Sequence, residues 1–172
     1  MTRMSKRFAI LVAAVAAATG FVALHTAAGA RTTARDFQAR FTETNASITN
    51  RAADLGVFQL INTAAGTVDG YGPATMVLAM SQDRSVQPCG PGSWTNAGIR
   101  RIVVERGVLV LREVAEVCET EIGLVGRGTW TVDGTSSTGM FAGAHGSGRD
   151  AVYLEAREST LTGKLRLRHD DR

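Results

Sequence analysis

Residues 99–117 read IRRIVVERGVLVLREVAEV, and this stretch decides the fold class. It contains two runs rich in β-branched residues, 99–105 and 108–117, which meet at Arg106-Gly107. A short junction with a glycine, a residue that accepts positive φ, is typical of the turn in a β-hairpin. The stretch therefore predicts two antiparallel strands in the middle of the chain.

Period-two alternation of apolar and polar side chains, the pattern of a half-buried strand, continues on both sides of this hairpin. It is clearest in residues 160–168, and in residues 124–133 it places Leu124, Gly126, Gly128, Trp130 and Val132 on one face. Glycines on an inward face leave room for a large neighbour or for sharp curvature. We expect further strands at residues 37–42, 56–62 and 73–80.

The segments between these strands are polar or rich in turn residues. We expect a loop at 44–54, with one helical turn around residues 51–55. We also expect a short connection at 66–72 and a longer loop at 82–98. The count is about eight strands with no long helix. An all-β fold follows, and even spacing favours an antiparallel β-barrel of about eight strands over the alternative, a two-sheet sandwich.

The first thirty residues are predicted to be a signal peptide helix. Three basic residues precede the apolar segment 8–24, and Ala28-Gly29-Ala30 fits a small-x-small cleavage site. We therefore expect two regions, a signal peptide at 1–30 and a single barrel domain at 31–172. Cleavage near Ala30 would release a secreted or extracytoplasmic protein without stable membrane insertion, and an uncleaved anchor is the alternative.

Removing the signal peptide changes the charge balance. The chain has 19 Lys plus Arg and 16 Asp plus Glu, and three of the basic residues lie in the first thirty positions, so the remainder holds 16 of each sign. Nucleic-acid binding needs an excess or a cluster of positive charge. No nucleic-acid partner is expected.

The two cysteines of the chain, Cys89 and Cys118, both follow the signal peptide. Two thiols that reach an oxidising compartment tend to pair, so we predict a disulfide between them. A metal site or a reactive thiol pair is the alternative, but Cys-x-x-Cys spacing is absent and no histidine lies close in sequence. We expect no metal and no cofactor.

Residues 126–148 read GRGTWTVDGTSSTGMFAGAHGSG. This segment resembles a group of small exported bacterial β-barrel proteins related to the allene oxide cyclase and dirigent-like barrels. The group has a Gly-Thr-Gly-x-Phe-x-Gly-Ala turn, whereas this chain has Ser136-Ser137-Thr138 where Gly-Gly-Thr is usual. The resemblance implies a barrel with a hydrophobic cavity and, as in the plant relatives, a role in steering cyclisation or coupling. No segment of this chain matches an active-site motif of those enzymes, so the resemblance assigns no catalytic residue.

Few residues of this chain are candidates for chemistry. His145, Ser147 and Asp150 contain the groups of a hydrolase triad, but Gly-x-Ser-x-Gly and a following helix are missing. His145 is therefore interpreted as a turn residue. Trp130 would either form the floor of a cavity or fill the core. We interpret four further residues as surface residues: Glu105, Arg112, Glu113 and Asp133.

The expected function is binding without catalysis, of a small apolar molecule or of a partner. This requires a cavity of about 300 Å³ or more inside the barrel.

The first alternative is an allene oxide cyclase-like or dirigent-like enzyme that steers cyclisation or coupling of a bound intermediate. Its pocket would hold inward polar groups, with His145, Glu113 and Tyr153 as candidates. A second alternative is an envelope protein that acts through an exposed strand edge. The predicted binding residues are Trp130, His145 and Tyr153.

Overall fold

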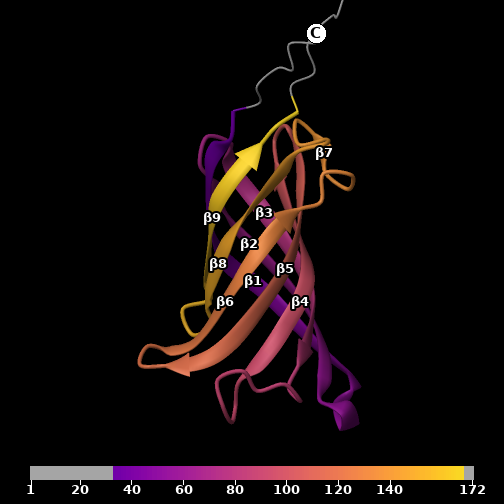
Figure 1. Cartoon of the computed structure of the whole chain (residues 1–172), viewed down its shortest axis with the longest axis vertical. Helices are drawn as coiled ribbons and strands as arrows, with labels where there is room; N and C mark the ends of the chain where they lie inside the picture. Colours follow the sequence, from indigo (N-terminus) through magenta and orange to yellow (C-terminus); the bar gives the residue numbers. More distant parts are fainter. Residues whose placement is uncertain (1–32, 169–172) are drawn as a thin grey trace, which may run out of the picture.

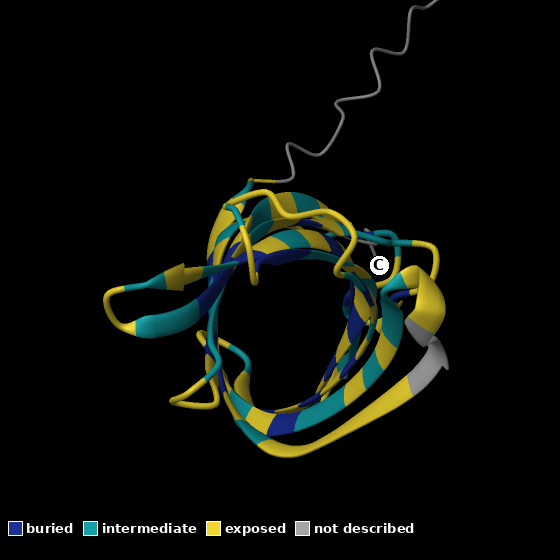
Figure 2. Ribbon diagram, turned by 90° about the horizontal axis from the view of Figure 1, so that it is seen from below, coloured by how far each residue is buried: buried dark blue, intermediate teal, exposed yellow. Residues whose placement is uncertain are grey.

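Eight long antiparallel strands close into a barrel. The computed structural model describes residues 33–168, and for residues 50–53 it describes the backbone alone. The strand order is β4-β3-β2-β1-β9-β8-β6-β5, and β5 pairs with β4 to complete the ring (Figures 1 and 2). The all-β barrel prediction is confirmed and the sandwich is wrong. The predicted signal peptide lies outside the described residues.

The strands are long for a chain of this size. The barrel consists of β1 (Arg35–Ala52), β2 (Val57–Val68), β3 (Gly72–Asp83), β4 (Trp94–Val104), β5 (Gly107–Thr120), β6 (Gly123–Val132), β8 (His145–Tyr153) and β9 (Glu158–Arg166). A 3₁₀ turn, η1 (Ala53–Leu55), follows β1, and the two-residue β7 (Thr138–Gly139) pairs with the start of β5. Residues 33–168 contain no α-helix. The hairpin predicted from residues 99–117 is confirmed as β4 and β5, with Val104 opposite Gly107.

One segment expected to be a loop is largely strand, because residues 44–52 continue β1. The expected connection 66–72 is shorter than predicted, since β2 runs to Val68 and β3 begins at Gly72. The expected loop 82–98 is confirmed for residues 84–93, and its two ends belong to β3 and β4. The polar residues Gln82 and Asn96 hid these strand ends, because each lies on an inward position and lines a cavity. β1 has two register shifts against β2, one between Glu43 and Asn45 and one between Thr49 and Ala52.

The interior of the barrel is filled at one end only. Near β7, the side chains of the core pack together, and the Trp130 ring meets the Phe37 ring edge-on with their centroids 5.3 Å apart. The largest fully buried apolar members are Trp130, Phe37, Phe141, Ile102, Leu109, Leu111, Leu161 and Leu165. The opposite half, at the lower end in Figure 1, contains the cavity described below.

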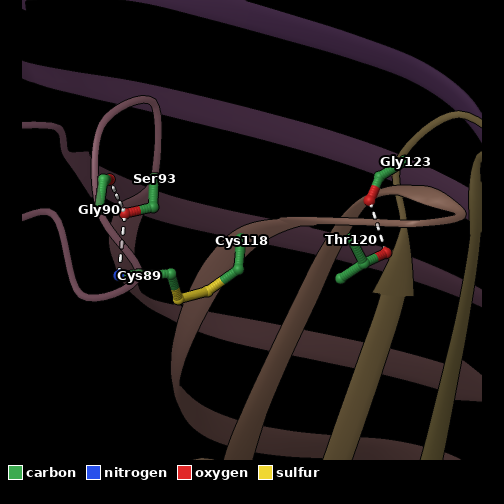
Figure 3. Close-up of a disulfide and its surroundings, with 6 residues drawn as sticks. All are labelled: Cys89, Gly90, Ser93, Cys118, Thr120 and Gly123. Atoms are coloured by element: carbon green, nitrogen blue, oxygen red, sulfur yellow. Dashed lines mark hydrogen bonds between the residues drawn. A yellow bond between two sulfur atoms is a disulfide. The ribbon is translucent and has the colours of Figure 1, made fainter.

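A disulfide joins Cys89 and Cys118, as predicted. It connects the loop between β3 and β4 to the end of β5 (Figure 3). The Ser93 hydroxyl accepts a hydrogen bond from the Cys89 amide and donates one to the Gly90 carbonyl, which fixes the shape of this loop. The bridge therefore holds the loop against the sheet at the hollow end of the barrel.

Candidate binding cavity

The hollow half of the barrel encloses a cavity of about 380 Å³. Its walls come from the inward positions of β1 to β6, β8 and β9, because alternate residues of each strand face the barrel axis. The walls are mainly apolar, and the apolar lining residues include Leu60, Ala64, Met76, Leu78, Met80, Trp94, Ala115, Val117, Leu124, Val152 and Leu154. This volume exceeds the value of about 300 Å³ that small-molecule binding was expected to require.

A buried arginine lies at the boundary between the cavity and the packed core. Arg100 on β4 is fully buried, and its Nε lies 2.5 Å from the Glu113 Oε1 of β5. Its Nη2 donates a hydrogen bond of 3.1 Å to the Glu113 Oε2 and lies 3.9 Å from the Asp150 Oδ2 of β8. Its Nη1 donates to the Ser159 hydroxyl of β9 at 3.4 Å. These four residues, which we name the floor cluster, thus tie four strands together.

The floor cluster has more acid than base. With both carboxyls ionised, Glu113 and Asp150 outnumber Arg100 by one negative charge. Burial raises the pKa of Glu113 against the opposing effect of Arg100, and the charge of Asp150 raises it further. Burial also raises the pKa of Asp150, again opposed by Arg100. The cluster therefore takes up a proton more readily than exposed carboxyls do.

Several polar atoms that surround the cavity have no hydrogen-bond partner in the described protein. They include four oxygens, on Asn62, Gln82, Asn96 and Asp150, and the Trp94 indole nitrogen. All five residues line the cavity. A buried polar group without a partner costs about 1 to 3 kcal/mol, so a cluster of them around one cavity indicates hydrogen bonding to a ligand or to water.

The mouth of the cavity is charged. Glu43 accepts two hydrogen bonds from the Arg157 guanidinium, of 3.0 and 2.8 Å, and the Asn62 amide donates to its second oxygen. Arg84 lies over the rings of Phe58 and Trp94, 4.9 Å from each centroid. Because Arg84 and Arg157 are exposed, these contacts are open to solvent.

The structure separates the three predicted binding residues. Tyr153 lines the cavity. Trp130 is not among the lining residues: it is 1% exposed, packs on Phe37, and its indole donates to the Arg149 carbonyl at 3.1 Å. His145 is exposed and borders a shallow depression with Arg112 and Asp133 on the outside of the barrel.

The triad residues point to opposite sides of the sheet. His145 and Ser147 are exposed on β8, whereas Asp150 is buried in the floor cluster. Strand alternation explains this, because residues 145 and 147 share one face and residue 150 lies on the other. The three side chains do not form a hydrolase site.

Residue-by-residue interpretation missed most of the floor cluster. Glu113, expected at the surface but named as an inward group for the enzyme alternative, is 7% exposed and lines the cavity. Glu105 and Arg112 are exposed as expected. The available signal was the parity of the positions: Arg100 shares its face of β4 with Ile102 and Val104, and Glu113 shares its face of β5 with Leu109 and Leu111. A charge on an apolar face of each of two paired strands predicts a buried ion pair.

Within residues 33–168, no group of His, Cys, Asp and Glu side chains is arranged to hold a metal ion. None of the helices in that part of the chain is long and apolar enough to span a membrane. No model of a known protein family matches the chain, and no curated protein matches it.

Proposed function

We propose that this protein is an exported barrel that binds a small, mainly apolar molecule in its cavity without transforming it. The observation that carries the proposal is the cavity of about 380 Å³, which lies within the range of small-molecule pockets and has mostly apolar walls. The disulfide is compatible with a location outside the cytoplasm. A closed barrel with a cavity also supports the kinship with allene oxide cyclase-like and dirigent-like barrels that residues 126–148 suggest.

Binding of N-phenyl-1-naphthylamine, a neutral dye whose fluorescence rises in apolar surroundings, tests this function. We expect the full barrel to bind the dye and Ala115→Leu to weaken binding roughly tenfold, because the larger side chain projects into the cavity. Ala97→Leu is the matched control, since Ala97 is exposed on the outside of the neighbouring strand β4. Equal binding by both variants, or no binding by the parent protein, would contradict the proposal.

The alternative function is an enzyme of cyclase or dirigent type. The floor cluster favours it, because Glu113 and Asp150 are buried carboxyls with raised pKa values beside an apolar cavity, as a general acid would be. Tyr153 also lines this cavity, whereas His145 does not. Recovery of the retained molecule in a chemically changed form distinguishes the enzyme from a binding protein.

A further inference from the structure

The polar atoms of the cavity are unbalanced between acceptors and donors. Among the described residues, the buried side-chain polar atoms without a hydrogen-bond partner are five oxygens and two nitrogens, on Asn62, Gln82, Asn96, Glu113, Asp150, Trp94 and Arg100. The Arg100 Nε and the Glu113 Oε1 lie 2.5 Å apart as an ion pair, which leaves four oxygens against the single indole N–H of Trp94 on residues that line the cavity. The other two guanidinium nitrogens of Arg100 donate to Glu113 and Ser159. A ligand that matches this lining brings hydrogen-bond donors rather than acceptors.

The charges of the floor cluster point in the same direction. Glu113 pairs closely with Arg100, which leaves Asp150 as the carboxyl without a close partner. Its side chain is 2% exposed, its Oδ2 is 3.9 Å from Arg100, and its Oδ1 has no hydrogen bond. A buried carboxylate of this kind is stable only when it is protonated or when a cation lies beside it.

Gly128 makes the room that Asp150 occupies. A Cβ atom at position 128 would lie 2.3 Å from the Val114 carbonyl oxygen and 2.6 Å from the Asp150 Oδ1, so the neighbouring backbone requires glycine here and the glycine leaves space beside the Asp150 carboxyl. Asp150 is therefore accommodated by the neighbouring strand rather than displaced to the surface. This arrangement keeps an acid at the closed end of an apolar cavity.

We infer that the cavity recognises a molecule with an apolar body and a protonated amine, and that the ammonium group binds at Asp150 in the floor cluster. An ammonium supplies three donors and one positive charge, which match the surplus acceptors and the extra negative charge of the cluster. A carboxylate in this position would face Asp150 and Glu113 and would be repelled. This inference rests on the proposed binding function and specifies its ligand class.

The test uses three probes with the same chain, octylamine, octanol and octanoate, in calorimetric titrations of the full barrel at neutral pH. We expect octylamine to bind roughly tenfold more tightly than octanol and octanoate to bind most weakly. Equal or reversed affinities would overturn the ammonium site and leave apolar binding intact. Failure of all three probes to bind would overturn both.

A pair of variants locates the site. Asp150→Asn should remove the preference for octylamine over octanol and leave octanol binding within about twofold, because the amide keeps the shape but not the charge. Asp36→Asn is the matched control, since the Asp36 side chain is 89% exposed on the outside of the barrel. Retention of the preference in Asp150→Asn would overturn the assignment. If that variant does not fold, the order of the three probes on the parent protein still decides.

Discussion

Arg100 is a buried charged residue that connects several strands inside the barrel. Its guanidinium is completely buried, and it contacts residues of β5, β8 and β9. Removing an ion from water costs several kcal/mol, which the close pair with Glu113 offsets only in part. Such a cluster adds little net stability but disfavours alternative registers, because any slip by one residue would move Arg100 to the outside and leave its acids unpaired.

At the level of single residues, the two carboxyls of the floor cluster predict how stability changes with pH. Their pKa values are raised in the folded protein, so the folded state retains protons that the unfolded chain releases above about pH 4. The contribution of these two carboxyls to the free energy of unfolding should therefore be greatest below that pH and should fall as the pH rises toward the folded pKa values. Asp150→Asn should make this fall shallower in urea titrations across pH 4 to 8.

Asp133 supplies a control of opposite sign. Hydrogen bonds from the Thr135 hydroxyl, the Ser136 amide and the Arg112 guanidinium hold its pKa well below the usual range. Its contribution is present above the unfolded pKa and is lost as the pH falls. Asp133→Asn should therefore lower the free energy of unfolding by a constant amount at neutral pH, and should change the slope of that free energy with pH only on the acid side. Identical pH profiles for Asp150→Asn and the parent protein would contradict the role given to Asp150.

At the level of elements, glycines on the inward faces of β8 and β9 permit Trp130 to lie flat within the packed half. A Cβ atom at Gly163 would lie 2.6 Å from the Trp130 Cζ2, and Gly148 is equally close to the same ring. The sequence predicted this use of glycine on the strand of Trp130 itself. The structure shows that the glycines beside the Trp130 ring belong to the two following strands.

Alanine substitutions test which glycines have neighbouring atoms too close to accept a side chain. Gly163→Ala should lower the free energy of unfolding by about 1 to 3 kcal/mol, because the added methyl group overlaps the Ser147 carbonyl oxygen at 2.4 Å and the Trp130 ring at 2.6 Å. Gly126→Ala should change stability by less than about 1 kcal/mol, since its nearest neighbour, the Val152 Cβ, would be 3.4 Å away. Urea unfolding followed by Trp fluorescence measures both. Equal losses would mean that the space beside Trp130 is not required.

At the level of the whole molecule, the barrel combines a solid half with a hollow half, and the disulfide lies at the hollow one. A cavity reduces the contacts that hold its walls together. The bridge between Cys89 and Cys118 offsets part of that loss, because it anchors the loop between β3 and β4 beside Trp94 and Arg84, two residues that line the cavity.

Removal of the bridge should therefore have a large effect. The cysteines are separated by 29 residues, and closing a loop of that length stabilises a protein by about 3 to 4 kcal/mol on the chain-entropy model. The double variant Cys89→Ser, Cys118→Ser should lose that amount in urea unfolding, and the parent protein under reducing conditions should match it. An unchanged midpoint in either case would show that the bridge does not contribute to stability.

The sequence by itself determined the all-β class, the approximate number of strands, the hairpin of β4 and β5 and the pairing of the cysteines. The first three features depend on period-two patterns and on local turn chemistry, which a single stretch of chain contains. The cysteine pairing follows from the presence of two cysteines in a chain expected to reach an oxidising compartment. The prediction from sequence failed for residues 44–52, where most residues are polar although the cavity-lining Ala46 and Ile48 are apolar. It also missed the strand ends at 82–83 and 94–98, because the inward residues Gln82 and Asn96 are polar and resemble loop residues until a cavity explains them.

The tertiary structure alone decided which residues line the cavity together. Arg100 and Glu113 lie on the paired strands of one hairpin, but Asp150 on β8 reaches them only after the barrel closes, whereas His145 and Ser147, two residues apart, are both held outside. The physical reason is that alternation along a strand decides which face of the sheet a side chain lies on, whereas the register between strands decides which side chains lie next to each other. Register depends on residues that are far apart in sequence, so the pattern along a single strand does not reveal it.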